Sequence, residues 1–202
     1  MRIPVNIMRF GVKGFSRRRL PPPAATNLRI AQIGTTAWFE DVRAFPPGAW
    51  AEMEAYRPQV VAACARDLRQ VAEQAQIRAI DLSSVDHAAF VLTGCGDEPL
   101  TDILRVVFWQ SFGVPVYELL VGPRGMLLAC ECEAHDGLHV EAGATVSLLD
   151  RELAFATAGR PRVRTGISGR IETERCACGR EGVRVMDIES EIPARRQLAA
   201  TA

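Results

Sequence analysis

The sequence has 202 residues, of which 48% are hydrophobic and 24% charged, values typical of a globular protein of one domain with at most a small appendage. Its formal net charge is zero, so no overall basic field favours a nucleic-acid partner. It contains no run of 18 apolar residues, and we therefore expect no transmembrane helix.

The two ends of the sequence differ in composition from its centre. Residues 1–25 are rich in arginine and close in Pro21-Pro22-Pro23, which predicts a flexible basic arm. The arm lacks the continuous apolar segment of a secretory signal, so we expect a cytoplasmic protein. The predicted organisation then continues with an α/β subdomain over 26–120, a β-rich subdomain over 121–190 and a tail over 191–202.

The first part of the predicted α/β subdomain combines a strand with a long helix. Residues 28–33 alternate apolar and polar side chains, as a half-buried strand does. Residues 49–77 repeat apolar residues at spacings of three and four, which predicts a helix. Pro58 fits the first turn of a second part of that helix, and a chain reversal near Tyr56-Arg57 is the alternative.

The second part of this subdomain has the pattern of a βαβ unit. The apolar run 88–93 predicts a buried parallel strand, which ends in the loop Gly94-Cys95-Gly96. Thr101 is suited to cap the next helix and Gly113 to end it. Residues 114–120 then predict a further strand, so we expect a parallel sheet with helices.

After residue 121 short β-type segments follow one another, most of them separated by glycine. This pattern predicts an antiparallel bent sheet or small barrel. The predicted strands cover residues 126–132, 138–141, 145–149, 153–157, 162–164 and 183–188.

The cysteines of this half indicate a metal site. Four of the six cysteines in the chain form two Cys-x-Cys pairs, and without a secretion signal such pairs favour a metal over disulfides. Asp136-Gly137 is a strong hairpin signal that would fold His139 back beside Cys132. Structural zinc takes four thiolate or imidazole ligands, with no open position. We therefore predict one structural zinc ion, held by Cys132, His139, Cys176 and Cys178.

Other interpretations of these residues stay open. Cys130 and His135 are substitute ligands if the selection of four is wrong. The cysteines could instead be reduced core residues beside surface histidines, since free cysteine is often simply buried. A redox pair is a further alternative.

The same residues carry a family resemblance. Residues 131–139 resemble the segment that follows the adenylate-contacting motif of phenylacetate–CoA ligases, which belong to the acyl-adenylate-forming superfamily. Residues 176–180 resemble the cysteine–proline–cysteine–glycine–arginine element of these ligases. Residues 56–58, 93–100 and 162–166 resemble three further family motifs, in the family's order.

The resemblance implies a partial N-terminal-domain fold of the acyl-adenylate-forming superfamily, with zinc ligands at the cysteine and histidine positions. It also implies that the loop over 93–100 lines an acyl pocket. Gly94, Cys95 and Gly96 are therefore candidates for a ligand-facing wall.

The sequence departs from the family at the positions that would handle the nucleotide. Only Gly34-Thr35-Thr36 remains of the phosphate loop, and Glu118, the counterpart of a magnesium-binding glutamate, is displaced relative to Tyr117. Ile167 replaces the aspartate that binds the ribose. Lys13 is the only lysine, so the small C-terminal domain with its catalytic lysine has no counterpart. Losses of charged contacts at a phosphoryl-transfer site cost orders of magnitude in rate.

We therefore expect a non-catalytic, zinc-binding homologue that acts as a binding or regulatory module. Its partner would be an aryl or acyl ligand, another protein, or a second copy docked on the surface that the missing lobes expose. One alternative is a half-enzyme that needs a partner chain for the nucleotide loop and the lysine. Another is a divergent AMP-forming acyl-CoA ligase with rearranged motifs.

Overall fold

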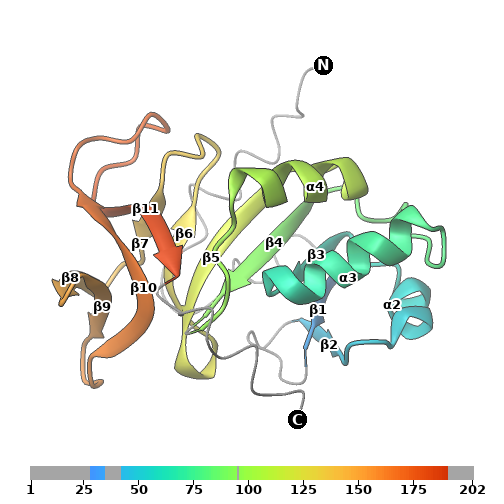
Figure 1. Cartoon of the computed structure of the whole chain (residues 1–202), viewed down its shortest axis with the longest axis horizontal. Helices are drawn as coiled ribbons and strands as arrows, with labels where there is room; N and C mark the ends of the chain where they lie inside the picture. The colour runs from blue at the N-terminus through green and yellow to red at the C-terminus, as the bar shows by residue number, and fades with distance from the viewer. Residues whose placement is uncertain (1–27, 35–41, 95, 191–202) are drawn as a thin grey trace, which may run out of the picture.

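The computed structural model of the chain describes residues 28–34, 42–94 and 96–190 (Figure 1). The predicted arm and tail, as well as Thr35, Thr36 and Cys95, lie outside these residues. The described residues form one mixed sheet of eleven strands, in the order β2-β1-β3-β4-β5-β6-β7-β11-β10-β9-β8. In this part of the chain no helix is long and apolar enough to cross a membrane.

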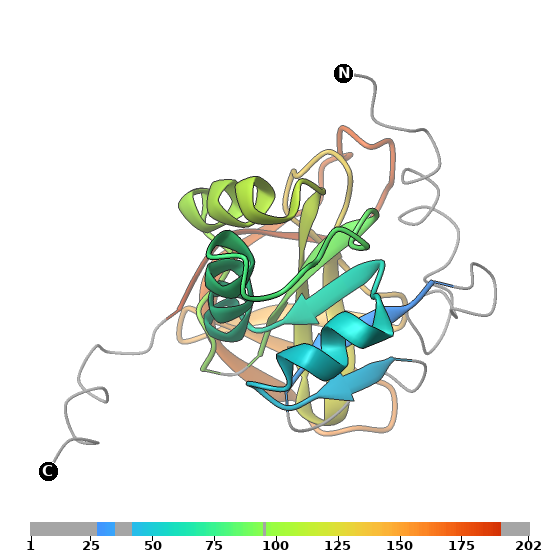
Figure 2. The ribbon, with the colours of Figure 1, turned by 90° about the vertical axis from the view of Figure 1, so that its right-hand side faces the viewer.

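The first half of the sheet is parallel and carries the helices. Buried residues of all three helices share one core with alternate residues of the strands, so the helices cover a single face (Figure 2). The strands are β1 Ile30–Ile33, β2 Arg43–Phe45, β3 Val60–Ala63, β4 Ala88–Thr93 and β5 Val116–Gly122. The helices are α2 Trp50–Tyr56, α3 Ala65–Gln76 and α4 Asp102–Phe112.

The second half of the sheet is antiparallel and has a core of its own, in which Leu128, Leu153 and Phe155 are fully buried. The short 3-10 helix η3, Pro123–Gly125, joins it to β5. Its strands are β6 Met126–Glu131, β7 Leu138–Val140, β8 Ala144–Leu149, β9 Glu152–Thr157, β10 Val163–Glu172 and β11 Arg184–Ser190. The prediction of an antiparallel half is confirmed, and the subdomain boundary at residue 121 stays a prediction.

The predicted helix over 49–77 is wrong in its centre. Helix α2 ends at Tyr56, because Arg57 takes a left-handed conformation (φ 53°) and Pro58 follows it. The apolar residues Val60–Ala63 then form β3, which lies buried between β1 and β4. A short run of valine and alanine suits a buried parallel strand as well as a helix, and only the neighbouring strands decide between them.

The predictions for α4 are confirmed. The Thr101 hydroxyl accepts a hydrogen bond from the Leu104 amide at the helix start, and Gly113 ends the helix at φ 69°. The adjoining strands β4 and β5 pair in parallel, as the βαβ pattern predicts.

Candidate metal centre

The four residues predicted as metal ligands come from two segments that are distant in sequence. Cys132 directly follows β6 and His139 lies in β7, while Cys176 and Cys178 lie in the loop between β10 and β11. Strand β7 pairs with β6 on one side and with β11 on the other. The loop before β11 is thereby carried to the β6–β7 hairpin.

The hairpin turn depends on a glycine. Gly137 has φ 77°, and a Cβ atom there would lie 2.2 Å from the Met186 sulfur and 2.8 Å from the Val185 carbonyl oxygen. Neither contact is possible for a real Cβ, so the turn can approach β11 this closely only with glycine. The predicted Asp136-Gly137 turn therefore holds its backbone close against β11 and places His139 beside Cys132.

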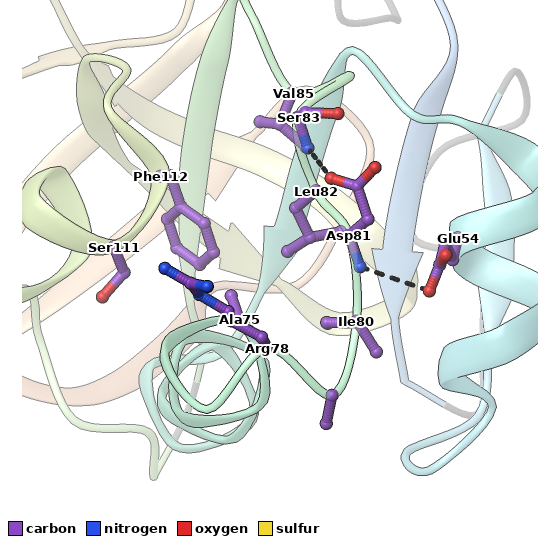
Figure 3. Close-up of a pocket in the computed structure, with 11 residues that line it drawn as sticks. Glu54, Ala75, Arg78, Ile80, Asp81, Leu82, Ser83, Val85, Ser111 and Phe112 are labelled. Atoms are coloured by element: carbon purple, nitrogen blue, oxygen red, sulfur yellow. Dashed lines mark hydrogen bonds between the residues drawn. The ribbon is translucent and has the colours of Figure 1, made fainter.

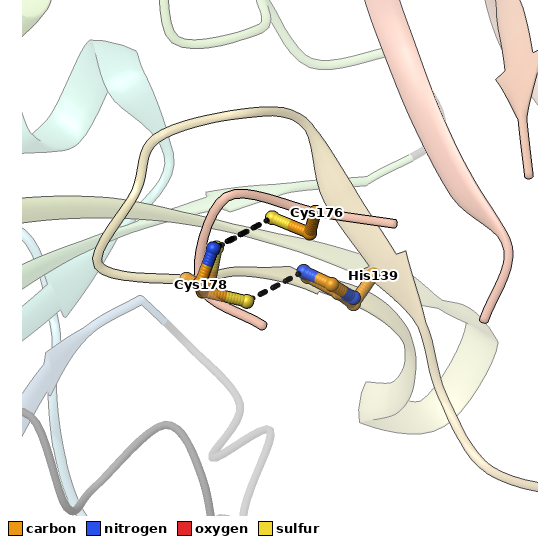
Figure 4. Close-up of side chains that lie close together, drawn as sticks. His139, Cys176 and Cys178 are labelled. Carbon is orange, nitrogen blue, oxygen red and sulfur yellow. Dashed lines mark hydrogen bonds between the residues drawn. The ribbon is translucent and has the colours of Figure 1, made fainter. Parts of the chain in front are cut away.

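One ligand atom from each of the four residues lies within 4.8 Å of every other. The Cys132 and Cys176 sulfurs are 3.6 Å apart, and the Cys178 sulfur is 3.5 Å from His139 Nε2 (Figure 4). A tetrahedral zinc ion with metal–sulfur bonds of about 2.3 Å and metal–nitrogen bonds of about 2.05 Å would separate such ligand atoms by about 3.6–3.8 Å. The geometry therefore fits a single tetrahedral ion.

The loop that carries Cys176 and Cys178 is a tight backbone turn. The Cys178 amide points at the Cys176 sulfur at 3.5 Å (Figure 4), and the Gly179 amide donates to the Cys176 carbonyl at 2.8 Å. Gly179 has φ 83°, a conformation that glycine adopts without strain. Amides directed at a sulfur favour its thiolate form, as a metal ligand requires.

Burial sets the charge state of the cluster. Cys132, Cys176 and His139 are buried. Burial raises the pKa of the Cys132 thiol to about 12. Burial, assisted by Arg180 and Arg184, lowers the pKa of His139 to about 4, so its imidazole is neutral at pH 7 and can donate a lone pair. Three cysteines and a neutral imidazole form the donor set of a structural zinc site, and a bound cation would stabilise the Cys132 thiolate that burial disfavours.

A buried arginine that no sequence motif selects joins the two ligand-bearing loops. Arg184, directly opposite His139 in the β7–β11 ladder, donates to both the Asp136 carbonyl and carboxylate. Its other terminal nitrogen donates to the Glu174 carbonyl at 3.2 Å. Arg184 is thus a positioning residue for the cluster. No local motif marks it, because its partners lie 48 and 10 residues away.

The substitute ligands Cys130 and His135 do not belong to the cluster that the described residues form. Cys130 is buried against β5, and burial raises the pKa of its thiol to about 11. His135 stacks on Tyr117 with ring centroids 5.2 Å apart, and its Nδ1 lies 3.1 Å from the buried Glu131 carboxylate.

Glu131 also links α4 to this hairpin. Its carboxylate receives two hydrogen bonds from the Arg105 guanidinium, at 2.7 and 3.1 Å, and one from the Glu118 amide at 2.9 Å. Arg105 donates further to the Val116 carbonyl at 2.6 Å. Glu131, which directly precedes Cys132, is therefore held in position by an arginine of α4.

Glu118, the counterpart of a magnesium-binding residue in the resemblance, is hydrogen-bonded to other residues inside the protein. Its carboxylate is buried and accepts hydrogen bonds from the Thr93 hydroxyl at 2.6 Å and the Leu100 amide at 3.0 Å. Burial raises its pKa to about 7. Glu118 thus ties the loop between β4 and α4 to β5.

Two further residues singled out from the resemblance lie in different surroundings. Ile167 is fully buried in the core of the antiparallel half. Gly94 is buried at the end of β4 and donates its amide to Asp97, whereas Gly96 is exposed. The ligand-facing role of Gly94, Cys95 and Gly96 stays a prediction.

A cavity of about 630 Å³ lies beside the loop that precedes β4, at the end of this strand opposite to Gly94 (Figure 3). It opens between α2, the loop before β4 and the end of α4, where Arg78 and Phe112 point into it. Its carboxylates hold the loop itself, since Glu54 accepts from the Asp81 amide and Asp81 from the Ser83 amide. This cavity contains none of the residues that the sequence motifs selected.

Comparison with known proteins identifies the fold. No protein-family profile and no curated protein matches the chain. Among solved structures, 2-hydroxyisobutyryl-CoA ligase in complex with 2-HIB-AMP and CoA has a TM-score of 0.62 and 13% identity, over 85% of this chain and 45% of that ligase. The coronafacic acid ligase of Pectobacterium brasiliense has a TM-score of 0.54 and 10% identity, over 89% and 42%. The anthranilate CoA ligase AuaEII has a TM-score of 0.52 and 11% identity, over 77% and 40%.

The described fold is therefore that of part of an AMP-forming acyl- or aryl-CoA ligase. The chain spans less than half the length of these ligases. At this low identity the likeness concerns the fold alone, and the finer assignment to the phenylacetate–CoA ligases stays a prediction.

Proposed function

We propose that this chain is a zinc-stabilised binding module, a non-catalytic homologue of the phenylacetate–CoA ligases. The observation that carries the proposal is the convergence of four ligand atoms, from Cys132, His139, Cys176 and Cys178, within 4.8 Å of one another, with two of the separations at 3.5 and 3.6 Å. A closed set of four protein ligands leaves no position for a catalytic water, so the zinc would be structural. Thiolates of this kind persist in a reducing compartment, which favours the cytoplasm.

The surroundings of the family's nucleotide residues support a binding role over catalysis. The Glu118 carboxylate is committed to Thr93 and Leu100, and Ile167 presents a buried aliphatic side chain where the family binds ribose. The solved ligases of this fold are named for acyl or aryl acids and CoA. We therefore expect an aryl or acyl compound or a partner protein as the ligand.

The metal is tested by elemental analysis of purified protein, where we expect about one zinc per chain. Cys178→Ser removes one thiolate and should lower the zinc content below about half of the parent value, because three ligands hold zinc far more weakly than four. Cys64→Ser is the matched control, since Cys64 precedes α3, is only half buried and lies outside the cluster. Equal zinc content in parent and both variants, or zinc-free parent protein, would refute the site.

Catalysis is tested separately by incubation with ATP, magnesium and a panel of aryl acids. We expect neither ATP binding nor pyrophosphate release from the purified chain. Turnover by the chain alone would show a divergent acyl-CoA ligase instead of a binding module.

A second candidate function follows from the length comparison. Because the chain spans 45% or less of the matched ligases, it could supply one part of a ligase whose remainder is another polypeptide segment. ATP binding that requires such a partner, and is absent without it, would distinguish this half-enzyme from the binding module.

A further inference from the structure

The edge strand β8 has the properties of a self-pairing surface. It forms the last strand of the sheet and pairs only with β9 among the described residues. Its six residues, Ala144–Leu149, include no charged residue and no proline, the usual protections of an exposed edge. The opposite edge strand, β2, has three residues and carries Arg43.

The β8–β9 hairpin determines which backbone groups of β8 are open. Asp150 and Arg151 form a two-residue turn with φ 49° and 73°, and Leu149 pairs with Glu152. Such a turn makes the closing pair hydrogen-bonded, so Leu149, Ser147 and Thr145 direct their backbone groups at β9. Ala144, Val146 and Leu148 direct theirs outward. The Ala144 amide already donates to the Glu141 carbonyl at 3.0 Å.

The backbone N–H and C=O groups of β8 that remain open can pair with the same groups of a second β8 strand. In an antiparallel pair of two β8 strands, the outward residues of one copy must face the outward residues of the other. With Val146 on the two-fold axis, the two Val146 residues exchange their hydrogen bonds, and each Leu148 amide reaches the Ala144 carbonyl of the other copy. This register gives about four intermolecular hydrogen bonds and uses every open amide of the strand.

The side chains favour the same occupant. Val146 packs against the core of the antiparallel half, and Leu148, on the same face, is 47% exposed at the open edge. In the register centred on Val146, Leu148 lies directly opposite Ala144 of the second copy, which leaves room for the leucine. No like charges meet, because the strand has none.

We propose that β8 is a dimerisation strand, which joins two copies of this chain into one continuous sheet across an antiparallel β8–β8 pair. The inference is independent of the zinc site and of any ligase activity. It identifies a second copy of the chain as the partner and Val146 as the residue on the symmetry axis.

A cysteine scan tests the register directly. Val146→Cys should give an intermolecular disulfide under mild oxidation, because directly opposed Cα atoms of a hydrogen-bonded pair are about 5.5 Å apart. Ser147→Cys is the matched control. Its nearest counterpart would be the diagonal neighbour at roughly 7–8 Å, too far to bridge. The parent protein under the same oxidation accounts for the native cysteines.

The strength of the dimer is measured by sedimentation of the full chain from about 10 µM to 1 mM, the range of small interfaces. Leu148→Glu should raise the dimer dissociation constant about tenfold or more, because it places charge in the joined sheet. Ile77→Glu changes a 70% exposed residue that follows α3 in the parallel half, and should leave the constant unchanged. Circular dichroism confirms that both variants fold.

The outcomes separate the possible occupants of the edge. A concentration-dependent dimer with crosslinking at position 146 supports the proposal. A monomer at all concentrations, a dimer unaffected by Leu148→Glu, or crosslinking at position 147 in place of 146 would overturn it. Slow amide exchange of β8 in a monomer would show that a segment of the same chain covers the edge.

Discussion

Single buried polar residues hold the loops on which the candidate metal centre and the predicted ligand wall depend. Arg184 connects the two ligand-bearing loops, and Glu118 connects the loop after β4 to β5. Burying a charged or polar group costs free energy unless hydrogen bonds compensate for it, so the bonds that these two residues make constrain their neighbours strongly.

The titration of Glu118 should be visible in stability. Burial raises its native pKa to about 7 from an ordinary value of 4.5, against the opposing effects of the hydrogen bonds from Thr93 and Leu100. Between these two pH values the native carboxyl keeps a proton that the unfolded chain has released. The free energy of unfolding therefore falls as pH rises through this window, by about 3 kcal/mol, and is level above it.

Glu118→Gln keeps an oxygen that can accept from Thr93 and Leu100 but cannot ionise. Urea unfolding of parent and variant at pH 5 and pH 8 should show the variant gaining on the parent by about 2.5 kcal/mol at the higher pH. A constant difference between the two proteins would mean that Glu118 does not titrate in this range.

The metal-ligand candidates could be selected from sequence, because two Cys-x-Cys pairs and a hairpin signal are local patterns. Arg184 and the Arg105–Glu131 pair could not, since their contacts depend on the pairing of β7 with β11 and on the position of α4 beside β6. The thiol Cys130 shows the limit of the pattern, as it lies within a pair yet outside the cluster.

At the scale of secondary-structure elements, terminal signals were more reliable than apolar periodicity. Thr101 and Gly113 predicted α4 correctly because a cap and a left-handed glycine act within one helical turn. Residues 49–77 misled because valine and alanine satisfy helical spacing while β3 is stabilised by two neighbouring strands. Burial of a segment between two strands depends on the tertiary structure, so the spacing of apolar residues along the sequence does not predict it.

The β6–β7 hairpin should respond to Gly137→Ala far more than an isolated turn would. The new Cβ would overlap Met186 and the Val185 carbonyl, in addition to the strain of a positive φ. Gly143→Ala is a matched control, because Gly143 has φ 85° and no atom within 4 Å of the added Cβ. We expect the control to lose about 1 kcal/mol of unfolding free energy and Gly137→Ala at least twice that.

Zinc content of the two variants gives a second measurement. Gly137→Ala should also lower the zinc retained, since it displaces the turn between Cys132 and His139, whereas Gly143→Ala should retain all of it. Equal losses in stability and equal zinc content for the two variants would show that the close approach to β11 has no structural role.

At the scale of the whole molecule, the antiparallel half has a narrow junction, where the β6–β7 hairpin meets the strands β8–β11. Strand β7 has three residues, and its ladder to β11 comprises two residue pairs, Arg184–His139 and Val185–Leu138. The metal-ligand candidates lie on both sides of this ladder. A bound zinc would therefore contribute most of the stability where backbone pairing is sparse.

Chelation should accordingly loosen one part of the protein. After treatment with a zinc chelator, hydrogen exchange should accelerate about tenfold or more over residues 132–140 and 174–185. Strands β4 and β5, which belong to the parallel half, should keep their protection. A uniform acceleration along the chain, or none, would contradict a metal that acts at the junction.

The shortness of β7 has a consequence for how the sheet forms. A slip of one residue along so short a strand would forfeit few hydrogen bonds, but it would turn His139 to the opposite face of the sheet. The imidazole would then point away from the sulfurs of Cys132, Cys176 and Cys178, and the ion would lose one of its four ligands. Only the native register of β7 brings all four ligands together, so metal binding would selectively stabilise that register during folding.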